Sequence, residues 1–239
     1  MSVSFDHIIR ANEYGFYCIP KWYLGRDIVD TLASGGVYEP VTLRFLQRQI
    51  GQGSIVTGGA FIGDFLPALH SALSQDGRII CFEPVPINFE ACQEVIRLNG
   101  LSRVDIHNVA VSAEEDELTM MVTRPSGKPI AAGERIVTDQ EPDGERFISI
   151  PTRKIDDLVA NDCAVSILHL DVEGHEDEAL RGASSVLQRC MPLVLLEADK
   201  RWRARGFLTL LQELAPDAGY EIAGEMEKNW IYRAMNKAG

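Results

Sequence analysis

The sequence predicts an α/β fold built on a mostly parallel sheet, and two observations support this. Short apolar runs alternate with amphipathic segments along most of the chain, and some runs, such as 193–196, are apolar at every position. Continuous apolar strands are typical of parallel sheets that helices cover on both faces. The last two such segments, 220–222 and 230–234, predict a C-terminal antiparallel hairpin that closes the sheet.

Each element can be placed from its own pattern, with glycine or asparagine marking several ends. The expected strands cover 55–56, 78–82, 104–111, 165–170 and 193–196. The expected helices cover 38–50 and 86–99, one with Phe65, Leu66, Leu69 and Leu73 on its buried face, one with Leu180, Ala183, Val186 and Leu187, and one with Phe207, Leu210, Leu211 and Leu214.

The alternation of strands and helices is interrupted in the middle of the chain. Residues 117–123 and 146–152 both have the composition of strands, with no helical segment between them. The stretch 124–145 that joins them is polar and contains glycine and proline. Because loops of this length are functional lids or disordered segments, we predict a flexible loop at 124–145 over one end of the sheet.

The first 37 residues differ from the rest of the chain. They are rich in aromatic side chains and are punctuated by glycines. We expect residues 1–37 to form an N-terminal extension of a main domain that covers 38–239. Packing of the aromatic side chains against the core is the simplest expectation. A lid over a substrate entrance, or a subunit contact in a homodimer, is the alternative.

Composition narrows the partners and the setting. With 239 residues, 46% of them hydrophobic, the chain can bury a full core. Its formal net charge of −12 argues against partners such as nucleic acid or an anionic membrane. No apolar run approaches the roughly 18 residues that span a bilayer, and the first ten residues lack the pattern of a secretory signal. The five widely spaced cysteines form no metal pattern, so a reduced, cytoplasmic setting is expected.

The most informative stretch is 54–63, where a short apolar run meets Gly58, Gly59 and Gly63 before an amphipathic segment. Glycines let the backbone approach a ligand closely, and the start of a helix presents N–H groups. The next strand ends in Glu83, and an acid there can accept hydrogen bonds from the two hydroxyls of a ribose. Together these features predict a nucleoside-bearing cofactor, although the glycines alone would also suit an ordinary strand–helix turn.

Further acids follow other apolar strands. Asp171 and Glu173 come directly after one strand, and Glu197 comes after the next. Ligands of parallel sheets bind outside the carboxyl ends of the strands, and burying such acids without a bound partner would be costly. We therefore expect these acids, Asn108 and the glycine-rich turn to line one cleft.

Six motifs occur in order between about residues 38 and 197. They are Tyr38-Glu39-Pro40, Gly59-Ala60-Phe61-Ile62-Gly63, Phe82-Glu83-Pro84, Asn108-Val109-Ala110-Val111-Ser112, Lys154-Ile155-Asp156-Asp157-Leu158 and Leu170-Asp171-Val172-Glu173-Gly174-His175-Glu176. In these motifs the chain resembles the FkbM-type methyltransferases. The resemblance implies a Rossmann-like class I methyltransferase fold with a seven-stranded sheet, and S-adenosyl-L-methionine as the cofactor. It also implies O-methylation of a hydroxyl on a small molecule such as a sugar, a polyketide or another secondary metabolite.

The resemblance also assigns roles to individual residues. The glycine-rich turn would hold the methionine end of the cofactor, Glu83 the ribose hydroxyls, and Asn108 and Val109 the adenine. Asp171 and Glu173 would face the methyl group and the acceptor. The expected cofactor-binding residues are Thr57, Gly58, Gly59, Ala60, Phe61, Gly63, Glu83, Pro84, Asn108, Val109 and Asp171, and the expected catalytic residues are Asp171, Glu173 and His175.

Two positions depart from the family pattern. The family loop normally begins with an acid, where this chain has Thr57, and Phe61 stands where the family has asparagine. In the family the acid helps to hold the ammonium group of the methionine end. We expect weaker cofactor binding as a result, unless Asp64 or another group compensates.

Methyl transfer to a hydroxyl requires a group that takes up its proton. A sulfonium methyl is already electrophilic, so the protein mainly aligns the acceptor and excludes water, while the proton goes to a base or a metal lowers its pKa. Asp171, Glu173 and His175 are the candidates, with Glu197 more distant. His169 is expected to be a buried, hydrogen-bonded histidine. Carboxylates this close can bind Mg²⁺, but they also serve as hydrogen-bond acceptors without it, and no metal is expected.

Two other classes of function are alternatives. A nicotinamide-dependent oxidoreductase has the same order of strand, glycine turn, helix and acid, but glycines at 58, 59 and 63 do not fit G-x-G-x-x-G. A non-catalytic protein that kept the fold is the third hypothesis, and Thr57 and Phe61 are the features that favour it.

Overall fold

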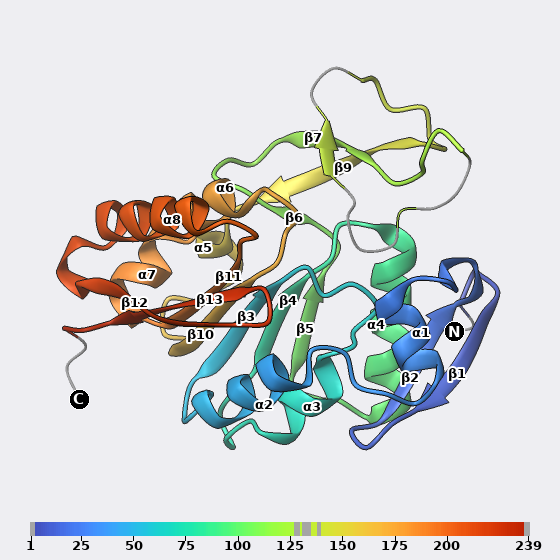
Figure 1. Ribbon diagram of the computed structural model, residues 1–239, viewed down its shortest axis with the longest axis horizontal. Coiled ribbons are helices and arrows are strands. Elements are labelled where there is room, and N and C mark those ends of the chain that lie inside the picture. The colour runs from blue at the N-terminus through green and yellow to red at the C-terminus, as the bar shows by residue number, and fades with distance from the viewer. Residues whose placement is uncertain (1–2, 127–129, 131–134, 138–139, 237–239) are drawn as a thin grey trace.

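The protein is described here by a computed structural model that covers residues 3–126, 130, 135–137 and 140–236. The strands of its central sheet are β3 (Ser54–Gly58), β4 (Ile79–Phe82), β5 (Val104–His107), β10 (Val165–Leu170), β11 (Leu193–Glu197), β12 (Tyr220–Met226) and β13 (Asn229–Ala234). They are arranged in the order β12-β13-β11-β10-β3-β4-β5 (Figure 1). β5, β4, β3, β10 and β11 run parallel, whereas β13 is antiparallel to both of its neighbours. The predicted seven-stranded, mostly parallel sheet with a closing hairpin is confirmed.

Helices cover both faces of this sheet, as Figure 1 shows. One face carries α5 (Ile155–Leu158), α6 (Glu176–Arg181), α7 (Ser184–Cys190) and α8 (Arg201–Leu214), and the other carries α2 (Pro40–Gln49), α3 (Leu66–Ser71) and α4 (Pro86–Asn99). Successive residues of a strand point to opposite faces, so Val56 belongs to the first core and Ile55 to the second. Both residues are fully buried, which explains why the strand reads as continuously apolar.

A single helix had been expected after β10, but the structure contains two, α6 and α7. Asp156 explains the break, because its carboxylate accepts hydrogen bonds from the backbone N–H groups of Ser185 and Val186 at 2.8 and 2.9 Å. These N–H groups lie in the first turn of α7, where a carboxylate is favoured. A residue distant in the sequence therefore starts the second helix.

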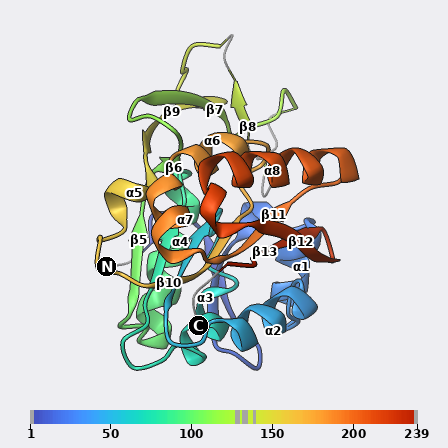
Figure 2. The ribbon, with the colours of Figure 1, turned by 90° about the vertical axis from the view of Figure 1, so that its left-hand side faces the viewer.

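A second, smaller sheet stands beyond one end of the central sheet (Figure 2). It contains β6 (Ala110–Val111), β7 (Glu117–Met121), β8 (Arg135–Val137) and β9 (Phe147–Arg153), in the order β6-β9-β7-β8. The predicted strand 104–111 is therefore wrong in its second half, because β5 and β6 belong to different sheets. The chain turns between them at Asn108, whose side-chain amide donates to the carbonyls of Glu83 and Pro84 at 2.8 and 2.9 Å.

The predicted loop 124–145 is not without structure throughout. β8 lies inside it and pairs antiparallel with β7, and Ile130 is buried with its N–H donating to the Val122 carbonyl at 2.8 Å. The flexibility predicted for 127–129, 131–134 and 138–139 falls on residues outside the described part of the chain.

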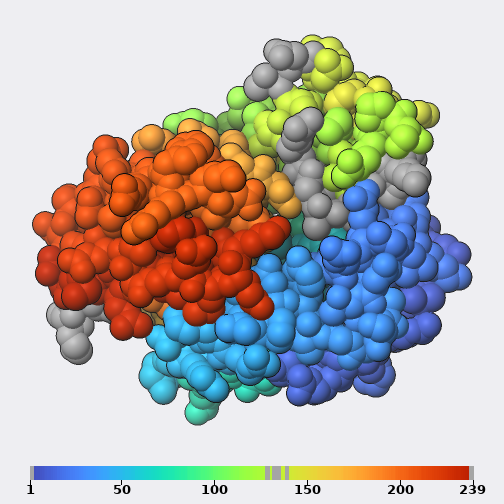
Figure 3. All heavy atoms as spheres, in the orientation of Figure 1, coloured from blue at the N-terminus to red at the C-terminus, as the bar shows by residue number. Residues whose placement is uncertain are grey.

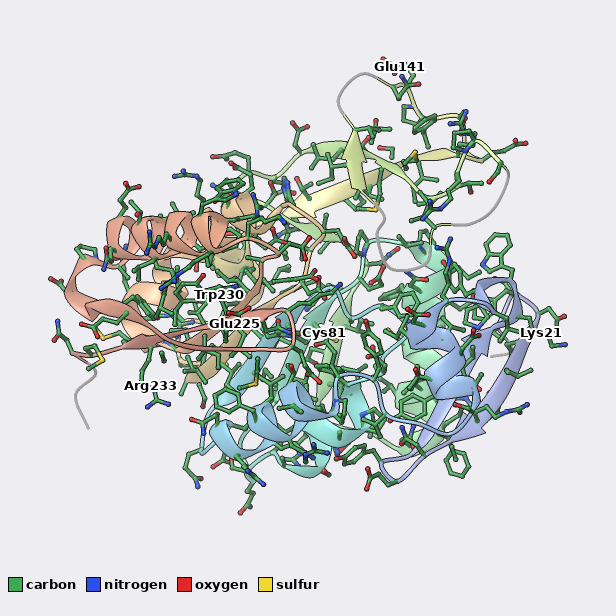
Figure 4. All side chains as sticks on the ribbon, viewed as in Figure 1. Lys21, Cys81, Glu141, Glu225, Trp230 and Arg233 are labelled. Carbon is green, nitrogen blue, oxygen red and sulfur yellow. The ribbon has the colours of Figure 1, made fainter. Side chains whose placement is uncertain are left out.

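The N-terminal extension forms a hairpin of β1 (His7–Ala11) and β2 (Phe16–Pro20), a short turn of helix η1 (Lys21–Tyr23) and the helix α1 (Asp27–Ala33). The hairpin lies beside α4 (Figure 1), and its core includes Ala91 and Val95 of that helix. Figure 4 shows Lys21 at the outer edge of this unit, pointing away from the central sheet. Of its aromatic side chains, Tyr17 and Tyr23 are buried, whereas Phe16 and Trp22 are exposed.

Two further features of the structure concern the cysteines and membrane-spanning helices. All five cysteines are free thiols. Among the described residues there is no helix of sufficient length and apolar character to cross a bilayer.

Candidate functional site

A pocket of about 240 Å³ lies at the carboxyl ends of the central strands β3, β4, β10 and β11. Figure 3 views the molecule from the side on which the blue N-terminal part meets the red and orange C-terminal part. The predicted site residues that line the pocket are Thr57, Gly59, Ala60, Phe61, Glu83, Pro84, Val109, Asp171, Glu173 and His175. The cleft predicted from the strand ends is therefore present as one cavity.

The glycine-rich turn brings the backbone close to the neighbouring strand end. Gly59 has a φ of +80°, and a Cβ atom at this position would collide with the carbonyl oxygen of Asp171. Its N–H and that of Ala60 both donate to the Phe82 carbonyl at 3.1 Å, which ties the turn to the end of β4. Only glycine tolerates both the positive φ and the close Asp171 carbonyl at position 59.

Glu83 is held in one orientation by donors of the protein. Its Oε2 accepts from the N–H of Phe61 at 2.8 Å, and its Oε1 accepts from the N–H of Val85 at 2.9 Å and from the Asn88 side-chain amide at 3.2 Å. The side chain is 4% exposed and lines the pocket. Hydrogen bonds from N–H donors stabilise an ionised carboxylate, so these contacts present a fixed negative group to a ligand.

Backbone strain is concentrated around the pocket. Glu39, Phe61 and Glu173 line it with φ values of 43°, 46° and 53°. A non-glycine residue in this left-handed region costs about 1–3 kcal/mol, and such strain is most often found at functional sites. Asparagine is several-fold enriched in this conformation, whereas a bulky residue such as phenylalanine is rarely found in it.

Acidic side chains gather at the end of the pocket formed by β10 and β11. Asp171, Glu173, Glu197 and Glu39 all line it, together with Lys228, whose Nζ lies 3.5 Å from Glu197 Oε1. Burial raises the pKa of the Asp171 carboxyl well above its usual range, and the negative charge of Glu197 adds to this. Asp171 Oδ1 is buried, and no described residue donates a hydrogen bond to it. Buried polar atoms without a hydrogen-bond partner are uncommon in folded proteins.

Hydrogen bonds to Glu176 hold the loop that carries Asp171, Glu173 and His175 in place. The Glu176 side chain is buried; its Oε1 accepts from the N–H groups of Val172 and Gly174 at 3.2 and 3.1 Å, and its Oε2 pairs with Arg203 at 2.8 Å. These contacts connect the loop to α8. Glu176 is the last residue of the sequence motif that begins at Leu170, but nothing in the local pattern indicated that it would hold this loop.

His175 begins α6 and is half-buried at the pocket wall, and its Nε2 lies 3.1 Å from Ser112 Oγ. Burial lowers its pKa below the usual value of 6.5, although the neighbouring acids Glu178 and Glu176 oppose this. The imidazole is therefore neutral at pH 7. A neutral imidazole has a ring nitrogen that can accept a proton.

Thr57, near the end of β3, forms a hydrogen bond with His169. Its Oγ1 lies 3.0 Å from His169 Nδ1, and both side chains are buried. Burial lowers the pKa of His169 to about 4, so the predicted buried, hydrogen-bonded histidine is confirmed. Nearby in the same pocket, burial together with the charge of Glu39 raises the pKa of Asp64 to about 7.

Part of the pocket lining is apolar. It includes Ile28 of the N-terminal extension, Val109, and Met120 and Ile136 of the second sheet. The sequence did not predict these contributions of Ile28, Met120 and Ile136, because they come from segments whose pairing depends on distant residues. The lining of the pocket thus combines several carboxylates with apolar side chains.

Three predicted residues do not line the pocket. Gly58 ends β3, where an added Cβ would lie 2.9 Å from Val172 Cγ1, and Gly63 is buried in the turn with a φ of +80°. The Asn108 side-chain amide donates to the Glu83 and Pro84 carbonyls and so connects the ends of β4 and β5. Residues such as Tyr38, Asn88 and Lys228 line the pocket without having been predicted as site residues.

No group of three or more histidine, cysteine, aspartate or glutamate side chains in the described part of the chain is arranged to hold a metal ion.

Comparison with known proteins places the chain. The model of the FkbM methyltransferase domain matches residues 58–222, more than half of the sequence. A solved structure of methyltransferase FkbM from Methylobacillus flagellatus KT is similar, with 22% identity and a TM-score of 0.54. That alignment covers 76% of this chain but 43% of the Methylobacillus chain, so this protein spans less than half of that relative's length.

A second solved structure, an O-methyltransferase from Bacillus cereus in complex with S-adenosylhomocysteine, has 14% identity and a TM-score of 0.51. The alignment covers 82% of this chain and 80% of that one. At such identities the likeness shows a common fold. No curated protein matches the chain.

Proposed function

The chain belongs to the FkbM methyltransferase family, and on that premise we propose that it transfers a methyl group from S-adenosyl-L-methionine to a hydroxyl group of a small molecule. The family and the fold predicted from the sequence are thereby confirmed. The predicted methyl donor is the one that this assignment supports.

The residues of the pocket fit such a donor. The observation that carries the proposal is that Glu83 and Asp171, two carboxyl side chains from different strand ends, line the same pocket. Gly59 lies between the two strand ends and keeps the backbone clear of side-chain atoms there. One pocket therefore offers a fixed acceptor for ribose hydroxyls and a carboxyl that would be stabilised by a nearby positive charge.

Each part of the pocket has a role in the proposed reaction. When bound, the donor supplies an electrophilic methyl group. The protein holds the acceptor in line with it beside Asp171 and Glu173, while the apolar residues Val109, Met120 and Ile136 suit the adenine of the donor. The carboxylates at the other end accept hydrogen bonds from hydroxyl groups of the acceptor, and this supports a hydroxylated small molecule as substrate.

We assign the uptake of the hydroxyl proton to His175, with Asp171 and Glu173 as hydrogen-bond acceptors that orient the hydroxyl. His175 is neutral at pH 7, lines the pocket, and contacts Ser112 through Nε2. A general base of this kind contributes about 10²–10⁴-fold to a rate. The pKa of Asp171 is raised by burial and by the charge of Glu197, so in the ligand-free protein its carboxyl holds a proton more firmly than an ordinary aspartate. This suits a group that orients the hydroxyl and does not take up its proton.

Calorimetry and mass spectrometry test the proposal together. The purified protein is expected to bind S-adenosylhomocysteine and, with S-adenosylmethionine and a panel of sugars and polyketide alcohols, to give a product heavier by one methyl group. Cofactor binding without turnover on any acceptor would favour the second candidate, a non-catalytic protein with the same fold. The strained backbone at Phe61 is the observation that supports this alternative. Absence of cofactor binding would reject both.

A further inference from the structure

A line of buried polar side chains connects the N-terminal extension to Glu83. The Tyr23 hydroxyl donates to Asn88 Oδ1 at 2.9 Å, and the Asn88 side-chain amide donates to Glu83 Oε1 at 3.2 Å. Tyr23 is 2% exposed and Asn88 is 1% exposed. Tyr23 lies outside residues 58–222, the part of the chain that matches the family model.

The chemistry of the amide gives this line a direction. A carboxamide has an acceptor oxygen at one side and a donor NH₂ at the other. Because Tyr23 donates to the oxygen of Asn88, the NH₂ group is turned toward Glu83. A buried carboxamide held at both ends cannot rotate without losing a hydrogen bond, so the tyrosine hydroxyl fixes the donor that fixes the carboxylate.

The same tyrosine supports the other oxygen of Glu83 through Phe61. The rings of Tyr23 and Phe61 pack with centroids 5.8 Å apart and an interplanar angle of 38°. Phe61 has a φ of 46°, and its N–H donates to Glu83 Oε2 at 2.8 Å. A strained residue of this kind persists only where its surroundings hold it, and the Tyr23 ring is part of those surroundings.

We propose that Tyr23 and Asn88 are positioning residues of the cofactor site, which aim the Glu83 carboxylate at the ribose hydroxyls. The N-terminal extension is then a working part of that site and not only a cover for α4. The identity of the ligand rests on the proposed function. The contacts that orient Glu83 do not.

Tyr23→Phe tests the proposal most cleanly, because it removes the hydroxyl and keeps the ring against Phe61. By calorimetry we expect it to weaken binding of S-adenosylhomocysteine about three- to tenfold, the effect of losing one hydrogen bond. Binding of the 2′,3′-dideoxy analogue, which has no ribose hydroxyls, is expected to change less than about twofold, since the lost orientation matters only where the carboxylate meets those hydroxyls.

Tyr220→Phe is the matched control. Tyr220 is fully buried, and its hydroxyl donates one hydrogen bond of 2.9 Å to the Pro192 carbonyl, away from the pocket. This variant is expected to lose a similar amount of thermal stability while its affinity for S-adenosylhomocysteine stays that of the wild type. Asn88→Asp is the second variant, and we expect it to weaken binding more than Tyr23→Phe because it turns a negative charge toward Glu83.

The outcomes separate this inference from the proposed function. Wild-type binding that Glu83→Ala weakens, with no effect of Tyr23→Phe or Asn88→Asp, overturns the inference alone. An equal effect of Tyr23→Phe on both ligands would assign the tyrosine a purely structural role and overturn it as well. If the wild type binds no S-adenosylhomocysteine, the proposed function and the inference fall together.

Discussion

The two ends of the pocket treat their carboxylates in opposite ways. At the end of β4, Glu83 accepts hydrogen bonds from the N–H groups of Phe61 and Val85 and from the Asn88 side-chain amide. At the end of β10, Asp171 has a buried oxygen with no donor among the described residues, and the charge of Glu197 raises its pKa. The protein's own donors orient the first carboxylate, whereas the second has an oxygen that none of the described residues orients.

This difference indicates a division of labour. A carboxylate held by N–H donors is already ionised and oriented, which suits a group that only has to bind. A carboxyl with a raised pKa near other acids responds strongly to a positive charge or a hydroxyl placed beside it, which suits a group at the reacting end. Variants at the two ends should therefore fail in different ways.

The largest effect is expected from Asp171→Asn. This change keeps the shape of the side chain and replaces a carboxyl, which the positive charge of the bound methyl donor would keep ionised, by a neutral amide, so methyl transfer to an acceptor identified by mass spectrometry should fall about 10²-fold or more. Affinity for S-adenosylhomocysteine, measured by calorimetry, should stay within about threefold of the wild type, since the ligand is held mainly at the Glu83 end. Equal losses of affinity and rate would contradict the division.

Glu83→Ala should show the reverse pattern in binding. Hydrogen bonds to a charged group are worth about 1.5–3 kcal/mol, so affinity for S-adenosylhomocysteine should fall about 10- to 100-fold in calorimetry. Glu115→Ala is the control, because Glu115 is exposed and, among the described residues, pairs with Arg153 at 3.7 Å. A Glu83 variant that binds like this control would remove the carboxylate from the cofactor site.

The acid-rich end also predicts a dependence of stability on pH. Burial raises the pKa of Asp64 from 3.8 to about 7, so the stability that the protonated group contributes is present at low pH and is lost as pH rises through 7. Asp64→Asn removes this titration. The melting temperature of the ligand-free wild type should therefore fall between pH 6 and pH 8 by at least about 2–4 °C more than that of the variant.

Parallel pH profiles for wild type and Asp64→Asn would show that Asp64 does not titrate in this range. The comparison between the two proteins is the informative quantity, because the pKa values of His175 and His169 are lowered and their protonation opposes the acids at low pH.

The smallest effect is expected from Thr57→Val, which keeps the volume and removes the hydroxyl that contacts His169. Loss of this hydrogen bond should reduce the free energy of unfolding by about 1 kcal/mol in chemical denaturation. Affinity for S-adenosylhomocysteine should change less than about threefold, because this threonine binds a protein group and not the charged end of a ligand. A larger loss of affinity would give Thr57 the direct role that the family assigns to an acid.

The sequence predicted the fold and the rim of the site because both depend on local patterns. Continuously apolar strands are followed by acids such as Glu83 and Asp171, and the order of strands and helices determines which edge of the sheet these acids share. The role of Gly59 could also be predicted from the sequence, because only glycine tolerates its conformation and the close Asp171 carbonyl.

Other features depend on contacts between distant parts of the chain, which no local pattern shows. Tyr23 meets Asn88 across 65 positions, and Asp156 starts α7 from 29 and 30 positions away. The predicted strand 104–111 failed at Asn108 because its amide bonds to two carbonyls of another strand end. In each case a tertiary hydrogen bond overrides the local preference of the sequence.

A crystal structure of the protein with S-adenosylhomocysteine is the most direct test of the central claim, that one pocket holds an adenosine-bearing methyl donor between Glu83 and Asp171. The expected result has both ribose hydroxyls within hydrogen-bond distance of the Glu83 carboxylate and the sulfur beside Asp171. A nucleoside bound elsewhere, or bound with its ribose away from Glu83, would contradict the claim.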